Sequence, residues 1–326
     1  MAESLPANAF RVMPEPLAAF ATDVFKTLNL PDADAALIAR YLVGVDLRGV
    51  SSHGTRQLRR YVAEFRDGLV NTRPDIQVVN ETPVSVVLDG DGGAGYLVAT
   101  QATGKVIEKA KVQGIAMAAT RNHGHVGSEG IYARLAPDLV TFSVAGGTDW
   151  SKPIEGDATV WDAMKAPPMC FGIPSEGSPP FVFDMNANML RDPNRLKEAL
   201  ETFPDLIFKS LGLKFVSTLL GGILAGTVPE GERKFAGATR GFLIVALDPA
   251  KLNEAGDFKR EVSRIISETR SLKPMPGLAS AELPGSLEWQ REKDWRVEGI
   301  PMTESHKELL RSIADAQGLS VPWVDR

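Results

Sequence analysis

The sequence predicts an α/β protein with a helical N-terminal region, and three observations support this prediction. Apolar residues recur at helical spacing through about the first 75 residues. Beyond them, short β-branched runs alternate with helical stretches, as they do in layered α/β proteins. No G-x-G-x-x-G pattern follows a strand and no P-loop pattern occurs, so a standard dinucleotide-binding fold is not supported.

Three helices are expected in the N-terminal region. Residues 16–29 carry apolar side chains at helical spacing. Asp32 and Asp34 are candidate N-caps of a second helix, because a short carboxylate accepts bonds from the first backbone amides of a helix. A third helix is expected over residues 55–67, and the polar segment DLRGVSSHGTRQL connects it to the second.

Strands and helices are expected to alternate over the rest of the chain. The expected strands lie at residues 76–79, 84–88, 115–120, 139–145, 169–174, 181–185 and 241–248. The expected helices lie at residues 95–113, from about 128, and at 205–225, 257–272 and 303–318. Residues 146–168 show no periodicity, and so long an irregular stretch in a compact domain is usually a functional loop or disordered.

Composition and charge narrow the class of protein. The 326 residues carry 36 Lys plus Arg and 41 Asp plus Glu, a formal charge of −5, which argues against nucleic acid or an anionic membrane as the main partner. The single cysteine, Cys170, cannot form an internal disulfide, which fits a reducing cytoplasm. The N-terminus has no secretory pattern, and no apolar run approaches the roughly 20 residues that span a bilayer. We therefore expect a cytoplasmic globular protein that does not enter a membrane.

The first candidate site surrounds His53 in the motif S-S-H-G. His53 is a candidate for proton transfer, because imidazole is the side chain that titrates nearest to neutral pH. Arg48 and Arg56 flank it, and a guanidinium can bind the carboxylate of an acidic substrate through two hydrogen bonds. The ordinary alternative is a helix N-cap at Ser52 or Thr55 beside solvated arginines. The residues alone leave both interpretations open.

The second candidate site is the segment Arg-Asn-His-Gly-His-Val-Gly at residues 121–127. It follows an expected strand and precedes an expected helix, where active-site loops of α/β proteins commonly lie. His123 and His125 are candidates for acid/base chemistry or for structural hydrogen bonding. Their i, i+2 spacing also permits a metal site, but no third ligand of matching type stands nearby. We therefore favour an acid/base histidine and expect no metal.

Two residues outside these segments are candidates for ligand contacts. Asp184 ends the expected strand FVFDM, which places a carboxylate at a sheet edge or crevice, and a turn cap is the alternative. Lys209 lies just inside a very apolar helix, where its ammonium group can contact phosphate or carboxylate or simply extend to solvent.

Seven segments carry a resemblance to a known family. They are DLRGVSSHGTRQLRRYV, DGDGGAGYLVATQAT, NHGHVGSEGIYARLA, FVFDM, KSLGLKFVSTLLGGILAG, GFLIVALDP and the C-terminal stretch with PG…EGIPM. In this order they resemble the malate/L-lactate dehydrogenase family that lies outside the standard Rossmann dehydrogenases. That family includes ureidoglycolate dehydrogenase, sulfolactate dehydrogenase and piperideine-carboxylate (ketimine) reductase. The resemblance spans nearly the whole chain.

The resemblance implies an oxidoreductase that depends on NAD or NADP and works as a homodimer on a small carboxylate substrate. The implied reaction is hydride transfer between nicotinamide and C2 of a 2-hydroxy or 2-oxo acid, with His125 as proton donor or acceptor. His53 falls on the histidine of the family's S-H-G motif and is implied to be catalytic as well. The implied substrate-binding residues are Arg48, Ser52, Arg56 and Tyr61. The implied cofactor-binding residues are His123, Asp184, Met185 and Lys209.

The sequence departs from the family pattern at several points. Gln57 stands where the family usually has an arginine, and K-S-L-G-L lacks one glycine of the family's K-G-x-G-L. Residues 147–168 replace a family loop that contains G-T-N-P. These departures keep two alternatives open: a reductase of cyclic imino acids, and a ligand-binding homologue that no longer uses nicotinamide.

The implied fold is a non-Rossmann, malate/L-lactate dehydrogenase-like α/β fold. We expect residues 1–120 to form a helical, substrate-binding part and residues 121–250 to form a cofactor-binding part with a mixed sheet. Residues 251–326 are expected to return and pack with the N-terminal helices.

Overall fold

The computed structural model describes residues 10–147, 158–163, 168–177, 179–190, 192–227 and 233–324. The chain divides into two compact units: unit 1 combines Met1–Arg73 with Ile266–Arg326, and unit 2 comprises Pro74–Ile265. These boundaries lie at residues 73 and 265, where we expected 120 and 250. The difference arises because the first two strands of the sheet and the helix after them pack within unit 2.

Unit 1 is helical and joins the two ends of the chain. Its elements are β1 (Phe10–Val12), α1 (Pro14–Thr27), α2 (Asp32–Leu47), the 3-10 turns η1 (Ser51–His53) and η2 (Thr55–Gln57), α3 (Leu58–Arg66), α9 (Ser286–Glu298), β9 (Ile300–Met302) and α10 (Glu304–Gln317). Strand β1 pairs antiparallel with β9, with Phe10 opposite Met302. Helix α1 packs on α2, α3 and α10. The C-terminal segment thus packs with the N-terminal helices within unit 1.

The helices of unit 1 form because their apolar residues fall on one face. In α1, Pro14 occupies the first turn, where its missing N–H costs nothing. Phe25 on the buried face of α1 contacts the rings of Tyr61 and Phe65 on α3, at centroid distances of 6.5 and 6.1 Å. Burial of aromatic side chains of this size stabilises a fold by roughly 1.5–3 kcal/mol each, so this cluster anchors α3 against α1.

Unit 2 is built on a mixed seven-stranded sheet in the order β2-β3-β4-β8-β5-β6-β7. Its elements are β2 (Gln77–Thr82), β3 (Ser85–Asp89), α4 (Gly95–Gln113), β4 (Ile115–His123), α5 (Gly130–Leu135), β5 (Val140–Gly147), β6 (Pro168–Ile173), β7 (Phe181–Asn186), α6 (Leu196–Thr202), α7 (Pro204–Thr218), the π-helical turn η5 (Leu219–Ile223) and β8 (Arg240–Leu247). Helix α8 (Ala255–Arg270) crosses the boundary between the units. Strands β3 and β4 are parallel and α4 connects them, whereas the other pairs are antiparallel. The predicted mixed α/β fold is confirmed.

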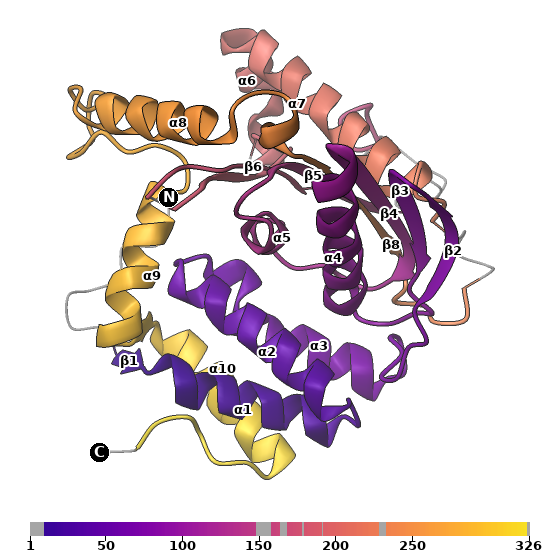
Figure 1. Ribbon diagram of the computed structural model, residues 1–326. Coiled ribbons are helices and arrows are strands. Elements are labelled where there is room, and N and C mark those ends of the chain that lie inside the picture. The colour runs from indigo at the N-terminus through magenta and orange to yellow at the C-terminus, as the bar shows by residue number, and fades with distance from the viewer. Residues whose placement is uncertain are drawn as a thin grey trace. The chain divides into compact units, whose positions relative to one another are not determined.

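Helices cover both faces of this sheet (Figure 1). On one face, Ala133 of α5 packs with Cys170 of β6 and Val182 of β7, so Cys170 is the core residue that we expected. On the other face, Val144, Met169 and Leu243 form a cluster against which Leu213 of α7 packs. Because strand residues alternate between faces, neighbours in one strand serve different layers.

The long apolar segment of unit 2 corrects one expectation. Helix α7 continues into η5, and Pro204–Ile223 is a 20-residue helix of mean hydropathy 1.5, long and apolar enough to cross a membrane by length and composition. The core helix of a soluble protein passes the same test, and 39% of this window is buried inside the protein. The segment packs along β5 and β8 of the sheet. The expectation that no apolar run approaches this length was wrong.

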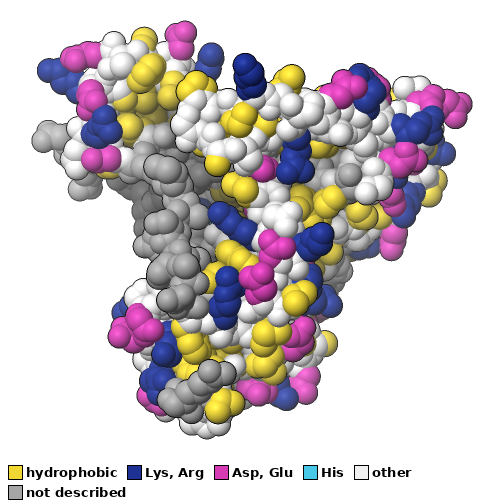
Figure 2. Space-filling model, turned by 90° about the vertical axis from the view of Figure 1, so that its left-hand side faces the viewer, with side chains coloured by type: hydrophobic (Ala, Val, Ile, Leu, Met, Phe, Trp, Pro, Cys, Tyr) yellow, Lys and Arg dark blue, Asp and Glu magenta, His cyan; other side chains and the backbone are white. Residues whose placement is uncertain are grey.

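The charged side chains are mixed in sign on the face shown in Figure 2, where Lys and Arg alternate with Asp and Glu and with apolar side chains. No continuous field of one sign covers the described part of that face. This pattern agrees with the small net charge of −5 and is not typical of a nucleic-acid-binding surface.

Candidate functional site

The first candidate segment lies in unit 1 and folds as two consecutive 3-10 turns before α3. The helix expected from residue 55 begins at Leu58, because η2 precedes it. His53 ends η1 and is half-buried, with its Nδ1 3.0 Å from Ser52 Oγ. Gln57 Nε2 donates to the carbonyl oxygen of Ser52 at 2.6 Å. Side chains therefore close the turn that carries His53.

A buried carboxylate on α2 binds the same turn. Asp46, which is 2% exposed, accepts hydrogen bonds through Oδ2 from the backbone N–H and the Oγ1 of Thr55, at 2.8 and 2.5 Å. Gly54 lies against Asp46, and a Cβ at this position would stand 1.8 Å from Asp46 Oδ1. Burial raises the pKa of Asp46 to about 7, against the two hydrogen bonds from Thr55 and the charge of Arg56, which lower it. The sequence analysis did not single out Asp46.

The N-terminus of α10 lies on the other side of Thr55. His306, 3% exposed, places its Nε2 3.0 Å from Thr55 Oγ1. Burial lowers the pKa of His306 to about 4, and the charge of Arg56 lowers it further, so the ring is neutral at pH 7. Thr303 caps α10 by accepting a hydrogen bond from the His306 backbone. Only folding brings these residues to the turn, which explains why sequence reasoning missed the connection.

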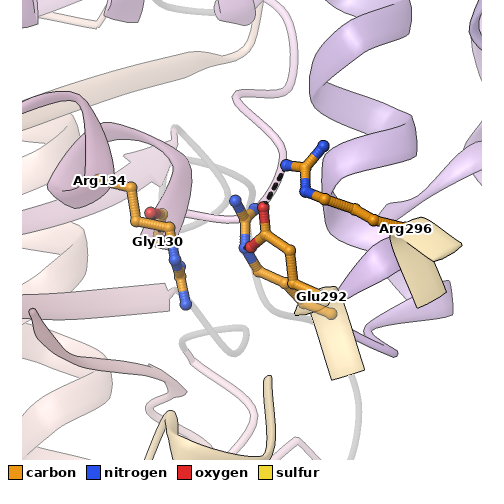
Figure 3. Close-up of polar contacts among 5 residues, drawn as sticks. Gly130, Arg134, Glu292 and Arg296 are labelled. Atoms are coloured by element: carbon orange, nitrogen blue, oxygen red, sulfur yellow. Dashed lines mark hydrogen bonds and ion pairs between the residues drawn. The ribbon is translucent and has the colours of Figure 1, made fainter. Parts of the chain in front are cut away.

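The two arginines expected to bind substrate differ in their partners. Arg48 Nε lies 2.9 Å from Glu292 Oε2. The other oxygen of this carboxylate accepts a hydrogen bond from Arg296 (Figure 3). Arg56 Nη2 instead donates to two neutral hydroxyls, Thr303 Oγ1 at 2.6 Å and Ser305 Oγ at 3.2 Å. A carboxylate already balances the charge of Arg48, whereas hydroxyls hold Arg56 in place without neutralising it. Arg56 is therefore the better candidate for binding an anionic group.

Tyr61, the remaining expected substrate residue, lies in the core of unit 1. It is 4% exposed, and its ring packs near Phe25. Because little of the ring is accessible, the structure supports a packing role and not substrate contact for Tyr61.

The second candidate segment lies in unit 2, at the end of β4. His123 is fully buried, with Nε2 2.7 Å from Thr120 Oγ1 and Nδ1 2.8 Å from the carbonyl oxygen of Gly124. Burial lowers the pKa of His123 to about 4, although its bond to Gly124 raises it, so the ring is neutral at pH 7. We had expected His123 to contact the cofactor, but its ring has no exposed surface and instead supports the loop that carries His125.

A glycine-rich turn braces that loop through backbone contacts. The N–H of Gly92 donates to the Asn122 carbonyl at 2.9 Å, and the N–H of Gly124 donates to the Gly93 carbonyl at 2.8 Å. A Cβ on Gly95, the first residue of α4, would stand 2.4 Å from the Gly124 carbonyl oxygen. The motifs DGDGGAG and NHGHVG, separate in the sequence, therefore pack backbone to backbone.

Asp89 adds a polar clamp at the base of the same loop. Its carboxylate accepts hydrogen bonds from Arg121 Nε at 3.1 Å and Asn122 Nδ2 at 2.9 Å. Burial opposes ionisation, but hydrogen bonds from Asn122, the Asp91 backbone and Arg121 together hold the pKa of Asp89 below its usual value. Asn122 adopts a φ of 55°, a left-handed conformation that asparagine tolerates better than most residues. His125 itself is half-buried just beyond this clamp.

Two carboxyl groups lie beyond His125. Asp184 on β7 accepts bonds through Oδ2 from Ser128 Oγ at 2.6 Å and the N–H of Gly130 at 2.8 Å. Glu129 is fully buried and bonded to Ser143 Oγ. Burial raises the pKa of Glu129 well above its usual value, and the charge of Asp184 raises it further. Sequence reasoning singled out Asp184, and it considered Glu129, inside the motif NHGHVGSEG, only as a possible partner in a metal site.

The other expected cofactor residues lie on the opposite face or on the surface. Met185 follows Asp184 in β7 and packs against the Val144 cluster beneath α7. Adjacent strand residues point to opposite faces, so the Asp184–Met185 pair can meet one ligand only around the open edge of β7, the last strand of the sheet. Lys209 on α7 is exposed.

A second lysine on α7 is buried, although the sequence analysis did not mark it. Lys214, 2% exposed, donates to the Trp161 carbonyl oxygen, and its Nζ stands 4.2 Å from the centre of the Trp161 ring. Burial lowers the pKa of Lys214. The contact ties α7 to the described residues 158–163 of the altered loop, whereas most of the expected loop 146–168 lies outside the described residues.

Neither candidate segment contributes to a metal centre in the described part of the chain, where no three His, Cys, Asp or Glu side chains cluster as ligands. Within unit 1 the fold brings together Ser52, His53 and Arg56. Within unit 2 it brings the loop of His123 and His125 to the glycine turn, and residues 128–130 to Asp184.

Comparison with known proteins gives consistent matches over the whole chain. The family model described as malate/L-lactate dehydrogenase matches residues 12–191 and 186–311. L-sulfolactate dehydrogenase of Methanocaldococcus jannaschii is 28% identical over 336 residues, covering 92% of this chain and 95% of the relative. Ureidoglycolate dehydrogenase (NAD(+)) of Escherichia coli O157:H7 is 25% identical over 319 residues, covering 86% and 89%. The structure of malate dehydrogenase from Pyrococcus horikoshii superposes with a TM-score of 0.82 at 26% identity, covering 97% of this chain and 98% of the other.

Proposed function

The chain belongs to the malate/L-lactate dehydrogenase family and is an oxidoreductase of the dehydrogenase/reductase class, and from this premise we propose that it reduces or oxidises C2 of a small 2-hydroxy or 2-oxo acid with NAD or NADP. The single observation that carries this proposal is the glycine-braced loop of His125. A half-buried histidine on a loop whose backbone is held by the Gly92 and Gly93 contacts has the fixed position that proton transfer requires.

The donor chemistry of unit 2 fits a nicotinamide dinucleotide. The Lys209 ammonium is exposed on α7, where a phosphate group can reach it. Asp184 and Met185 lie on β7, the last strand of the sheet within the described residues, and His123 supports the reacting loop from inside. When bound, the nicotinamide would supply or accept the hydride at C2. The ureidoglycolate dehydrogenase relative carries NAD(+) in its name, which favours NAD over NADP as the cofactor.

His125 holds the proton that the substrate oxygen needs. In the reducing direction we assign its imidazolium as the donor to the C2 oxygen, and in the oxidising direction its neutral ring accepts the hydroxyl proton. His123 cannot replace it, because the buried ring has both nitrogens engaged and a pKa near 4. The two histidines differ in exposure: His125 is half-buried and a substrate can reach it, whereas His123 is buried and supports the loop.

In unit 1 we assign substrate recognition to the turn of His53. Arg56 carries a charge that its hydroxyl partners leave uncompensated, which suits a substrate carboxylate. Arg48 would have to leave Glu292 to do the same, and its role is therefore secondary. Ser52, 3.0 Å from His53 Nδ1, orients the imidazole.

We also propose that the protein is a homodimer in the cytoplasm. The stripe Phe208, Val216, Leu219 and Ile223 on the α7 segment is 40–66% exposed, and soluble monomers rarely leave such contiguous apolar surfaces open. Light scattering on the purified protein tests this assignment. Twice the chain mass is expected, and a monomeric mass at micromolar concentration would contradict it.

Activity is tested by mixing the protein with NADH or NADPH and a panel of 2-oxo acids, and following loss of the reduced-nicotinamide absorbance. One arm of the panel contains cyclic imino acids, because the same proton donor could serve a C=N bond. Turnover of at least one panel member is expected. Absence of both turnover and cofactor binding at millimolar concentration would overturn the proposal.

A further inference from the structure

Three buried polar side chains in unit 1 form a continuous chain that the proposed chemistry does not require. Asp46, Thr55 and His306 are 2%, 0% and 3% exposed, and they come from α2, η2 and α10. Thr55 is the link, since its Oγ1 stands 2.5 Å from Asp46 Oδ2 and 3.0 Å from His306 Nε2.

The proton positions in this chain follow from counting hydrogens. The Thr55 hydroxyl has one hydrogen, and when Asp46 is ionised its carboxylate is the stronger acceptor, so in that state the hydroxyl donates to Asp46 Oδ2. Its oxygen must then accept from His306, which fixes the neutral His306 ring as the tautomer with hydrogen on Nε2. The chain therefore has a direction, from His306 through Thr55 to Asp46.

This arrangement is costly if stability is its only purpose. Asp46 Oδ1 is buried and forms no hydrogen bond within the described residues. Buried acceptors without partners destabilise a fold, and well-packed apolar side chains are often better than buried charges at the same place. The charged groups nearby do not balance Asp46 by contact: Arg56 bonds to α10, and on the α9 side Arg48 bonds to Glu292.

We propose that Asp46, Thr55 and His306 are positioning residues that hold the turn of His53 and Arg56 in its reactive geometry. Thr55 stands two residues after His53 and one before Arg56. Asp46 binds both its backbone and its hydroxyl, while Arg56 reaches Thr303 and Ser305 at the start of α10. The turn is thus fixed to α2 and α10 on either side. This inference rests on the proposed role of the turn in substrate recognition.

The test uses Thr55→Val, which keeps the shape and removes the hydroxyl, with Thr55→Ser as the conservative variant. For the best substrate of the panel, Thr55→Val is expected to lower kcat/KM roughly 10- to 100-fold, because small misplacements of binding groups cost rates of this order. Thr55→Ser should restore activity to within about threefold of the parent. Thr103→Val is the matched control: this buried hydroxyl on α4 donates only locally, to the Ala99 carbonyl at 2.7 Å.

The same variants separate positioning from simple stability. Thermal unfolding is measured for each, and a structural role alone would lower the melting temperature while leaving kcat/KM of the folded enzyme unchanged. Thr55→Val with kcat/KM within about twofold of the parent would overturn the proposal.

A second readout does not depend on activity. Nitrogen-15 NMR of the histidine rings should show His306 as the Nε2–H tautomer in the parent, and Thr55→Val should remove that bias. If the parent turns over no substrate, the proposed function fails while this readout still tests the network. An unchanged His306 tautomer in Thr55→Val would refute the network itself.

Discussion

Both units hold a half-buried histidine on a loop, but different chemical groups fix the loop in each. Each holds a half-buried histidine, His53 in unit 1 and His125 in unit 2, beside a second histidine that is buried and neutral. Each buried histidine pairs with a threonine hydroxyl, at 3.0 Å in the first case and 2.7 Å in the second. Each region also contains a buried acid with a raised pKa, Asp46 or Glu129.

The difference lies in what fixes the loop. In unit 1 side chains from distant parts of the chain meet at Thr55, so the turn depends on a long-range network. In unit 2 the backbone of residues 90–95 packs directly on the backbone of residues 122–125, and His123 bonds to residues within its own segment. Glycine therefore supports one site and hydroxyl and carboxyl groups the other, and substitutions should affect the two regions differently.

The largest effect is expected from Gly95→Ala in unit 2. The new Cβ would stand 2.4 Å from the Gly124 carbonyl oxygen and 2.6 Å from that of His125, and backbone atoms cannot rotate away. We expect about 3 kcal/mol or more of lost stability and a loss of turnover above roughly 100-fold. Chemical denaturation and the panel assay measure both.

Gly104→Ala is the matched control, because it lies on the same helix and a Cβ there meets nothing within 4 Å. It should gain up to about 1 kcal/mol from the higher helix propensity of alanine. If Gly95→Ala behaved like Gly104→Ala, the backbone-braced account of unit 2 would be wrong.

The second effect is a change in how stability depends on pH. His123 has a folded pKa of about 4 against the usual 6.5, so only the unfolded chain gains a proton between these values. Its contribution to stability is complete above pH 6.5 and is lost as the pH falls toward 4, by about 3 kcal/mol at most. His123→Gln keeps hydrogen-bonding groups and should flatten this loss in denaturation experiments at stepped pH.

Glu129→Gln provides a control of opposite sign in the same loop. Because the folded pKa of Glu129 is raised, its contribution is present below the unfolded pKa near 4.5 and is lost as the pH rises. The stability of Glu129→Gln relative to the parent should therefore increase as the pH rises. Parallel pH curves for both variants and the parent would contradict the assigned burial of these groups.

A smaller effect is expected from Gly54→Ala in unit 1. Here the added Cβ meets a side chain, Asp46 Oδ1, and not the backbone. We expect a cost of about 2 kcal/mol that is largely relieved when Asp46→Ala is added, as a double-mutant cycle would measure. Additive costs of the two substitutions would show that Gly54 and Asp46 do not compete for the same space.

The smallest effects are expected at ion pairs. Arg48 and Glu292 have side chains 15% and 10% exposed, and Glu292 keeps Arg296 when Arg48 is replaced. Arg48→Gln should cost about 1 kcal/mol, while Arg195→Gln, in a pair with side chains 63% and 61% exposed, should leave the melting temperature essentially unchanged. Equal costs in thermal unfolding would mean that burial does not distinguish these pairs.

Local sequence patterns predicted much of the fold. Helix α4 covers residues 95–113 as expected, because its ends are marked by the glycine-rich turn and by Gly114 in a left-handed conformation. The three-residue strands β1 and β9 were missed, since their pairing joins residues 10 and 302 and no local pattern reports it. Helices α6 and α9 were missed as well.

The candidate site residues also fall into two groups: those that a local motif marks, and those whose role depends on burial or on contacts between distant parts of the chain. His53 and His125 stand out by residue type and motif, whereas the role of His123 depends on its complete burial, which its neighbours in sequence do not indicate. Asp46 and His306 are 260 positions apart and meet only through Thr55. Tyr61 was expected to bind substrate only from the family resemblance, whereas its place on the apolar face of α3 puts it in the core.

The most direct test of the central claim replaces the proton donor. His125→Asn and the parent are compared in NADH binding by tryptophan fluorescence and in turnover of the best panel substrate. We predict that cofactor binding is retained and that kcat falls roughly 100-fold or more, the usual contribution of a general acid. Full turnover by His125→Asn would contradict the assignment of His125 and with it the account of unit 2 as the reacting region.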